Sequence, residues 1–120
     1  MSITREEVLK GQTCPLELEA NLADLLHKIN ILRGIYGQPM IINSGYRTPD
    51  HNRRIGGARN SAHLYCQAVD FRDLSGKLKD WLMQNICVLE ELGLWLEDPS
   101  KTAGWCHVQT RPAKSRVFIP

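Results

Sequence analysis

The stretch SAHLYCQAVDF, residues 61–71, contains a histidine and an aspartate, His63 and Asp70, seven positions apart. Asp70 lies in an apolar, strand-like run, where an ionised carboxylate is costly unless it is paired or bound to a metal ion. A second histidine, His107, lies in a similar run at 105–109. Two imidazoles and one carboxylate are the protein ligands of many catalytic zinc sites, in which water takes the fourth position. The stretch therefore predicts a zinc site, with the rest of the chain as its scaffold and substrate platform.

The same ligand types leave a second metal open. Two histidines and one carboxylate also form the facial triad of non-haem iron(II) oxygenases. In those enzymes the first histidine and the carboxylate usually stand one residue apart on a longer barrel. The seven-residue spacing and the length of 120 residues favour zinc. His107 alone would more often be a buried core residue, and it is Asp70 that favours the metal interpretation.

Length and composition indicate one domain, residues 1–120, of an ordinary globular protein with 42% hydrophobic and 23% charged residues. A net charge of +2 without any run of like charges does not indicate nucleic-acid binding. We expect no membrane insertion and no signal peptide, because no apolar stretch is long enough for either. The protein would thus be made in the cytoplasm and would need release to reach a substrate outside it. The cysteines match no metal-binding spacing, and we expect buried free thiols at Cys14, Cys66, Cys87 and Cys106.

Hydrophobic spacing predicts the secondary structure. Apolar residues three and four apart indicate long amphipathic helices over 16–36 and 76–92. Shorter helices are expected up to Lys10 and over 49–55, the latter within a long polar loop at 44–60 that is typical of a functional segment. The predicted strands are 40–43, 67–71, a hairpin of 94–96 with 105–110, and 117–119. This order predicts an α+β fold with helices packed on one face of a small, mostly antiparallel sheet.

Four further polar residues are candidates for the site. Arg47 directly follows a predicted strand, and its guanidinium suits bidentate capture of a carboxylate, although an ordinary surface salt bridge fits equally well. A hydrolase also needs a proton carrier. Glu97 and Asp98 are the candidates, because hairpin pairing would place Glu97 opposite Trp105 and on the face of His107. They could equally be solvated acids. His51 in the polar loop could face the cleft.

Four motifs resemble one known family. They are SGYRTPxHN at 44–52, IGGA at 55–58, SxHx6DF at 61–71 and WxHV at 105–108. In this order they resemble the zinc D-Ala-D-Ala peptidases, which share the hedgehog/DD-peptidase fold and include carboxypeptidases, murein endopeptidases and phage endolysins. The chain looks most like the compact phage and prophage members. The resemblance implies that His63, Asp70 and His107 bind zinc.

The resemblance also implies roles for two other residues. Arg47 would hold a substrate carboxylate or carbonyl and stabilise the developing oxyanion, and Ser61 would support the first ligand or contact the substrate. The chain departs from the family pattern at two positions. Cys66 stands where glycine is frequent, and Gly104 stands where many members carry the catalytic glutamate. Either Glu97 or Asp98 replaces that glutamate, or the enzyme is slow or inactive.

The resemblance therefore predicts a zinc metallopeptidase that cuts a D,D or L,D bond in peptidoglycan stem peptides or cross-links. We expect a monomer whose partner is a peptidoglycan peptide and which acts at the cell wall or in the periplasm, as endolysins released by phage lysis do. Two alternatives remain at this point. One is a non-catalytic, zinc-stabilised peptidoglycan-binding module, and the other is a structural phage protein.

Overall fold

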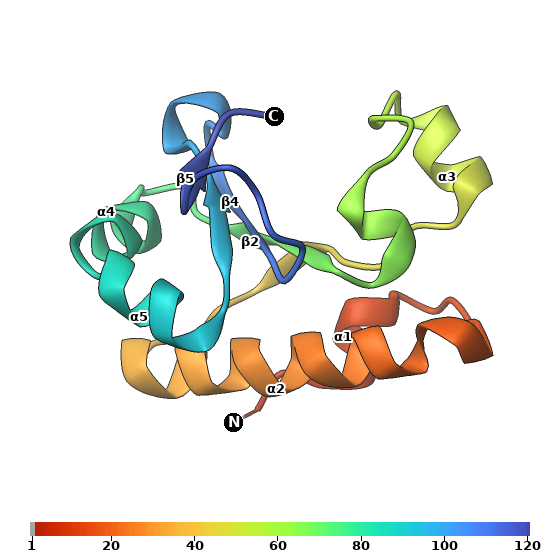
Figure 1. Cartoon of the computed structure of the whole chain (residues 1–120), viewed down its shortest axis with the longest axis horizontal. Helices are drawn as coiled ribbons and strands as arrows, with labels where there is room; N and C mark the ends of the chain where they lie inside the picture. Colours follow the sequence, from red (N-terminus) through yellow and green to blue (C-terminus); the bar gives the residue numbers. More distant parts are fainter. Residues whose placement is uncertain (1) are drawn as a thin grey trace.

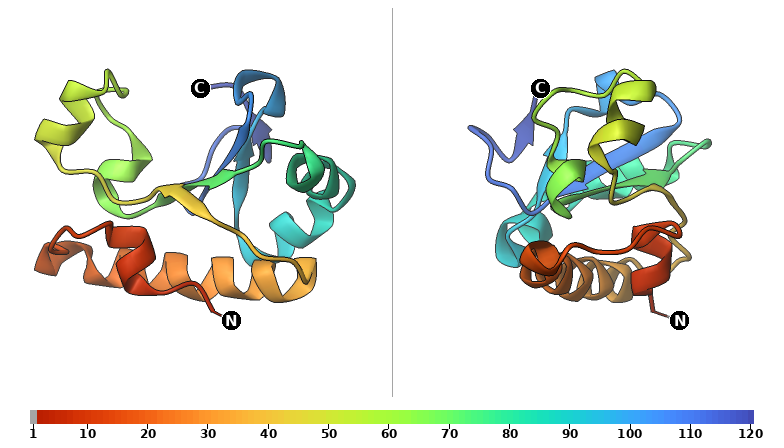
Figure 2. Two further views of the ribbon diagram at one scale, coloured as in Figure 1. Left: turned by 180° about the vertical axis from the view of Figure 1, so that it is seen from behind. Right: turned by 90° about the vertical axis from the view of Figure 1, so that its right-hand side faces the viewer.

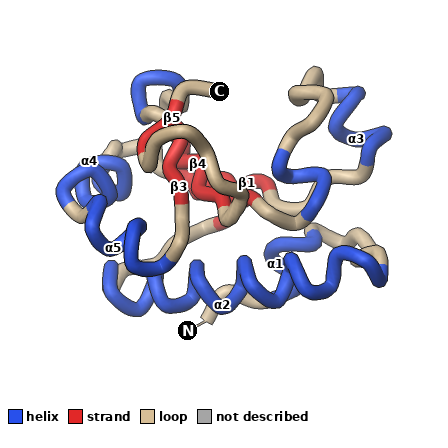
Figure 3. Tube along the Cα trace, viewed as in Figure 1, coloured by secondary structure: helices blue, strands red, loops and turns tan. Residues whose placement is uncertain are grey.

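The computed structural model describes residues 2–120, and within them five strands form one sheet in the order β1-β2-β4-β3-β5. The pairs β1–β2, β2–β4 and β3–β4 are antiparallel, and β3–β5 is parallel. Figure 3 shows the strands grouped in the middle of the molecule with helices around them. The bounds are β1 Ile42–Ser44, β2 Ala68–Arg72, β3 Trp95–Glu97, β4 Trp105–Gln109 and β5 Val117–Phe118. The predicted α+β class and the mostly antiparallel sheet are confirmed.

The longest helix, α2, runs along one side of the molecule beneath the sheet, with α4 and α5 beyond one end of the sheet and α3 beyond the other (Figure 1). The chain ends lie on opposite sides of the molecule, as both views of Figure 2 show. Within residues 2–120, no helix combines the length and the apolar character needed to cross a membrane. The helices are α1 Arg5–Leu9, α2 Glu19–Tyr36, α3 Pro49–Arg54, α4 Lys77–Gln84 and α5 Ile86–Leu92, with single 3-10 turns η1 Leu16–Leu18, η2 Ala62–Tyr65 and η3 Pro99–Lys101.

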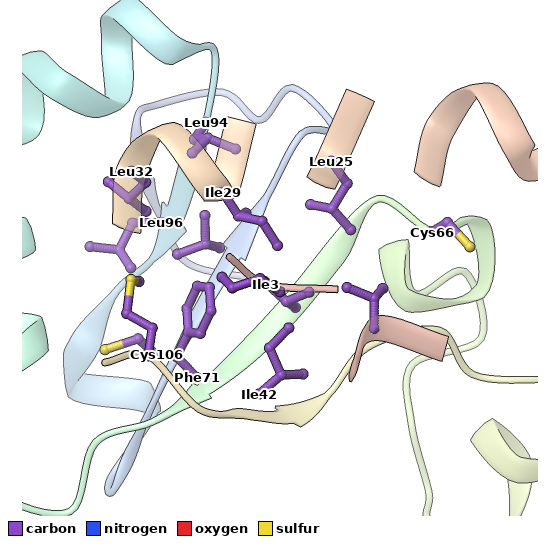
Figure 4. Close-up of a cluster of buried hydrophobic side chains, with 14 of the residues drawn as sticks. Ile3, Leu25, Ile29, Leu32, Ile42, Cys66, Phe71, Leu94, Leu96 and Cys106 are labelled. Atoms are coloured by element: carbon purple, nitrogen blue, oxygen red, sulfur yellow. The ribbon is translucent and has the colours of Figure 1, made fainter. Parts of the chain in front are cut away.

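The two faces of the sheet have different environments, because successive residues of a strand point to opposite faces. Phe71 of β2, Leu96 of β3 and Cys106 of β4 are almost fully buried in the hydrophobic core. Figure 4 shows them packed beside Ile29 and Leu32 of α2. The alternate residues of the same strands are on the face away from this core. The sheet thus has one face for the helices and one face for polar side chains.

The predicted helix over 76–92 is wrong in one respect, since two helices occupy this segment. Asn85 interrupts it with φ −129° and ψ 40°, and its side-chain nitrogen donates a hydrogen bond to the Trp81 carbonyl at 2.8 Å. Asparagine side chains compete for backbone hydrogen bonds and so disfavour continuous helix. The apolar spacing continues across the break, with Leu82 and Leu89 both buried, which is why the sequence pattern did not reveal it.

The N-terminal segment supports the loop that follows β1. Helix α1 begins with a capping box between Thr4 and Glu7. The Val8 carbonyl of this helix accepts a hydrogen bond from the Tyr46 backbone at 2.8 Å. A Cβ on Gly45 would lie 2.1 Å from that same carbonyl oxygen, so only glycine permits this approach. The position of Gly45 matters because its own carbonyl contacts the polar site.

Candidate metal centre

His63, Asp70 and His107 meet on the polar face of the sheet. Asp70 lies in the middle of β2, and the register of the β2–β4 pair places it directly opposite His107. His63 comes from the 3-10 turn η2 that leads into β2. The exposed fractions are only 2% for His63, 6% for Asp70 and 8% for His107. Three ionisable side chains are therefore held together with little water around them.

The three side chains are close enough to share one ion. Asp70 Oδ1 lies 3.1 Å from His63 Nε2 and 2.9 Å from His107 Nδ1. One candidate ligand atom from each residue lies within 4.8 Å of the other two. Ligands about 2.0–2.2 Å from a tetrahedral zinc ion stand roughly 3.3–3.6 Å apart. The cluster spacing is close to this range, so shifts of a few tenths of an ångström would place the three atoms around one ion.

The outer nitrogen of each imidazole has a fixed hydrogen-bond acceptor. His63 Nδ1 lies 2.7 Å from the Gly45 carbonyl, and His107 Nε2 lies 2.7 Å from Gln109 Oε1. Gln109 in turn donates from Nε2 to the Arg111 carbonyl at 2.8 Å, which orients its amide oxygen toward the imidazole. With a proton on its outer nitrogen, each imidazole has its inner nitrogen available to a metal ion, or to a second proton shared with Asp70 when no metal is bound. This is the tautomer that a metal-binding histidine needs.

The charge state of the cluster is set mainly by Asp70. Burial opposes ionisation of this carboxyl, but hydrogen bonds from His107 and His63 outweigh burial and lower its pKa to about 2. Burial alone would lower the pKa of His107, and the same contact with Asp70 raises it instead. A cation between the three side chains would be bound by the imidazole nitrogens and the carboxylate oxygen that otherwise share a proton. Nitrogen and oxygen ligands of this kind fit Zn²⁺.

Arg47 lies beside this cluster and is fixed by the polar loop. Its Nη2 is 3.4 Å from Asp70 Oδ2, its Nε donates to Ser44 Oγ at 3.1 Å, and its Nη1 donates to Asn52 Oδ1 at 3.3 Å. A Cβ on Gly57 would lie 2.0 Å from Asn52 Oδ1, so a larger residue there would displace the side chain that contacts Arg47. Burial lowers the pKa of Arg47, but from a value of 12.5, so the guanidinium keeps its charge.

Glu97 faces the cluster from β3. The pairs Trp95–Gln109 and Leu96–Val108 set a register that continues to Glu97 opposite His107. The prediction that Glu97 lies opposite Trp105 is therefore wrong, and the register differs from it by two residues. Glu97 is half-buried and lines a cleft of about 370 Å³ together with the cluster and Arg47. Burial raises the pKa of Glu97, and while His107 opposes this rise, Asp70 adds to it.

Two of the other predicted site residues lie away from this cleft. Asp98 accepts a hydrogen bond from the Ser100 backbone at 2.9 Å, which caps η3, and it lines a different cavity. That contact with Ser100 also lowers the pKa of Asp98. His51 is exposed on α3 and lines a separate cavity beside Lys10. Ser61 does line the cleft, where its Oγ accepts the backbone N–H of His63 at 3.2 Å and caps η2.

The two departures from the family pattern are both left-handed backbone positions. Gly104 has φ +87°, so a glutamate there would be strained by its own Cβ. Cys66 has φ +55° and ends η2, a conformation that glycine adopts more readily. The Cys66 side chain is fully buried, and burial raises the pKa of its thiol to about 12. Cys66 is thus an inert packed thiol at a turn.

Sequence reasoning missed Gln109, Asn52 and Arg111, which hold or flank the cluster. Gln109 could have been found by extending strand alternation two residues beyond His107, because that places both on one face. The contact between Asn52 and Arg47 depends on the fold of the polar loop, for which the sequence carries no comparable periodic signal.

Comparison with known proteins identifies the class of protein. The family model described as Peptidase M15 matches residues 2–93, a range that includes Arg47, His63 and Asp70. The chain therefore belongs to the Peptidase M15 family. It is also 33% identical over 61 residues to a zinc D-Ala-D-Ala carboxypeptidase of Streptomyces albus G. This alignment covers 50% of the chain and 24% of the relative, so the chain spans about a quarter of that protein's length.

Proposed function

We propose that this protein is a zinc-dependent metallopeptidase that hydrolyses an amide bond in peptidoglycan stem peptides or cross-links. The observation that carries the proposal is the buried cluster of His63, Asp70 and His107, whose outer ring nitrogens are both anchored. Anchoring of both outer nitrogens leaves the two inner nitrogens and the Asp70 carboxylate to share one ion, as metal-binding histidines do. Membership of the Peptidase M15 family and the name of the carboxypeptidase relative support the same activity.

In this proposal His63 Nε2, His107 Nδ1 and one Asp70 oxygen hold a zinc ion. When bound, zinc polarises the scissile carbonyl and makes a water molecule available as a nucleophile near neutral pH. Asp70 Oδ2 remains beside Arg47, so the carboxylate is held from both sides. Ser61 supports the position of His63 through the backbone hydrogen bond that begins η2.

Glu97 is the proposed proton carrier. It lies opposite His107 in the paired strands and lines the cleft from which a water molecule would attack. It would take a proton from this water and give it to the departing amine, which must be protonated to leave. Glu97 comes from a neighbouring strand, so an acid at position 104 is not required.

Arg47 is the proposed stabiliser of negative charge on the substrate. Its guanidinium is held by Ser44, Asn52 and Asp70 and therefore reorganises little during reaction. A fixed cation aimed at the site where the carbonyl oxygen becomes negative lowers the barrier more than a mobile one. Arg47 thus orients the carbonyl and stabilises the oxyanion.

The finer features of the proposal follow from the resemblance to compact phage members of the family. We propose an endolysin-like monomer that reaches the cell wall after release and cuts a D,D or L,D bond. Both bond types place an amide next to a carboxylate, so the same cleft chemistry serves either. The cleavage products distinguish a carboxypeptidase from an endopeptidase.

Two isosteric variants test the function and the proton carrier together. Incubation of the zinc-loaded protein with muropeptides, followed by mass spectrometry, should reveal a new amine. Glu97→Gln should lower turnover by about 10²- to 10⁴-fold with zinc content unchanged. Asp98→Asn removes the same charge from the adjacent residue and should retain activity.

Two results would contradict the proposal. Full activity in Glu97→Gln would place the proton carrier elsewhere. Tight zinc and muropeptide binding without any new amine would instead identify a non-catalytic binding module.

A further inference from the structure

Strand β4 contributes a row of side chains to the cleft. Trp105, His107 and Gln109 alternate along one face of β4, and Arg111 follows two residues after the strand. All four line the same cleft. Gln109 links the row, because its oxygen accepts from His107 and its nitrogen donates to the Arg111 carbonyl. Gln109 therefore connects Arg111 to His107, which lies four residues earlier in the chain.

The guanidinium of Arg111 is fixed on several sides. Nη1 donates to the Asn60 carbonyl at 2.7 Å, and Nε donates to Gln67 Oε1 at 3.2 Å. The guanidinium carbon lies 5.3 Å from the centroid of the Tyr65 ring, in a cation–π arrangement. Arg111 is half-buried, so these contacts restrict a side chain that is usually flexible. The group is thus preorganised at the edge of the cleft.

The contacts of Arg111 leave its positive charge without a counter-charge. Its acceptors are a backbone carbonyl and a neutral amide, and in the part of the chain that the structure describes no acidic side chain pairs with it. Arg47, the other arginine of the cleft, differs because Asp70 compensates it. Nη2 of Arg111 has no acceptor among residues 2–120. A fixed, uncompensated guanidinium with a free donor is suited to bind a carboxylate.

We infer that Arg111 binds a carboxylate of the peptide substrate and makes the enzyme selective for substrates that carry one near the scissile bond. This inference rests on the proposed peptidase function and assigns the two arginines different tasks. Arg47, beside the metal cluster, contacts the carbonyl that is attacked, and Arg111, at the edge of the cleft, holds the negative end of the substrate. Amidation of that carboxyl removes the charge and weakens binding.

Four synthetic peptides provide the probe. The parent is L-Ala-γ-D-Glu-L-Lys-D-Ala-D-Ala, and the others carry an amide at the C-terminal carboxyl, at the D-Glu α-carboxyl, or at both. For the native protein we expect the parent to be cleaved with a kcat/KM about 10- to 100-fold above that of one singly amidated peptide, the range of a charge-assisted hydrogen bond. The peptide that loses this factor identifies the carboxyl that is bound.

Three variants separate binding from general damage. Arg111→Gln should raise KM for the parent by about 10- to 100-fold, leave kcat little changed and remove the preference over the amidated peptide. Arg111→Lys keeps the charge and should restore part of the preference. Arg59→Gln is the matched control, because Arg59 is exposed, lies near Asn60 and lines a different cavity. It removes the same charge and should leave the preference intact.

Several outcomes would overturn the inference. One is a preference for the parent peptide that Arg111→Gln leaves unchanged. Another is a fall in kcat/KM in Arg111→Gln that is equal for acid and amide peptides. A third is the same loss of preference in Arg59→Gln. If the native protein cleaves none of the peptides, the proposed function fails. Calorimetric binding of the same four peptides to the zinc-loaded protein then judges the inference by itself. Tighter binding of the acid, lost in Arg111→Gln, supports it, and equal binding of acid and amide by the native protein contradicts it.

Discussion

Replacing Gln109 with leucine removes the acceptor that fixes the tautomer of His107. The two residues are 6% and 8% exposed, so little water is available to replace the amide oxygen 2.7 Å from the imidazole. A metal-bound His107 must carry its proton on Nε2, and in the variant this buried N–H is left without a partner, at a cost of about 1–3 kcal/mol. The metal-free protein avoids this cost, because the proton can move to Nδ1 and point at Asp70. The penalty therefore falls on the zinc-bound state.

Zinc affinity should accordingly fall by about 10- to 100-fold in Gln109→Leu, as is usual when the partner of a metal-binding histidine is removed. Competition with a chromophoric chelator at fixed pH measures this change. Gln38→Leu is the matched control, since Gln38 is exposed and lines a different cavity, and it should bind zinc like the native protein. An affinity in Gln109→Leu equal to that of the control would refute the argument that Gln109 holds the ligand.

Two other predictions concern the fold. Gly104→Ala should lower the free energy of unfolding by about 1–2 kcal/mol, because the backbone is left-handed there although a Cβ has room. Gly45→Ala should lower it by more, because its Cβ would lie 2.1 Å from a carbonyl oxygen. Urea denaturation checks the order, and equal losses would contradict it. Burial raises the pKa of Cys66 and Cys106 from 9.0 to about 12. Because the folded-state pKa is the higher one, their stabilisation is complete below about pH 9 and is lost as the pH rises toward about 12. Unfolding free energy that stays flat over this range would contradict the prediction, as would alkylation of these thiols in the native protein as fast as that of exposed Cys87.

The meeting of the three cluster residues follows from features that a sequence carries. Asp70 and His107 each lie inside a short apolar run, and strand alternation then places each on the face opposite its buried neighbours. The antiparallel register that brings them directly opposite each other is a property of the fold. His63 needs only the short turn η2 to reach the same face.

The positions of Glu97 and Asp98 were predicted less accurately than those of the cluster residues. The predicted pairing put Glu97 opposite Trp105, but the connection between β3 and β4 includes the turn η3, and the register moves by two residues. Because side chains alternate with period two, a shift of two keeps Glu97 on the same face. The adjacent Asp98 lies one position further and caps η3 instead.

The polar loop and the segment 76–92 both contain features that periodic sequence patterns do not predict. Arg47 is fixed by Asn52 and Ser44 in an irregular segment, and such contacts follow no period that a pattern can detect. The break at Asn85 lies within a segment whose apolar spacing is regular, so periodicity alone predicted one helix there. Local side-chain hydrogen bonds decided both cases.

The most direct test of the proposed function is the hydrolysis of a stem peptide by the same protein with and without its metal. Mass spectrometry of the parent pentapeptide should show a new amine with the zinc-loaded protein, none after chelation, and recovery when one equivalent of zinc is restored. Asp70→Asn, which keeps the shape of the side chain but removes its charge, should lose zinc and hydrolysis together. Hydrolysis that continues at the same rate in the chelated protein or in the zinc-depleted variant would contradict the assignment of His63, Asp70 and His107 as the centre of the reaction.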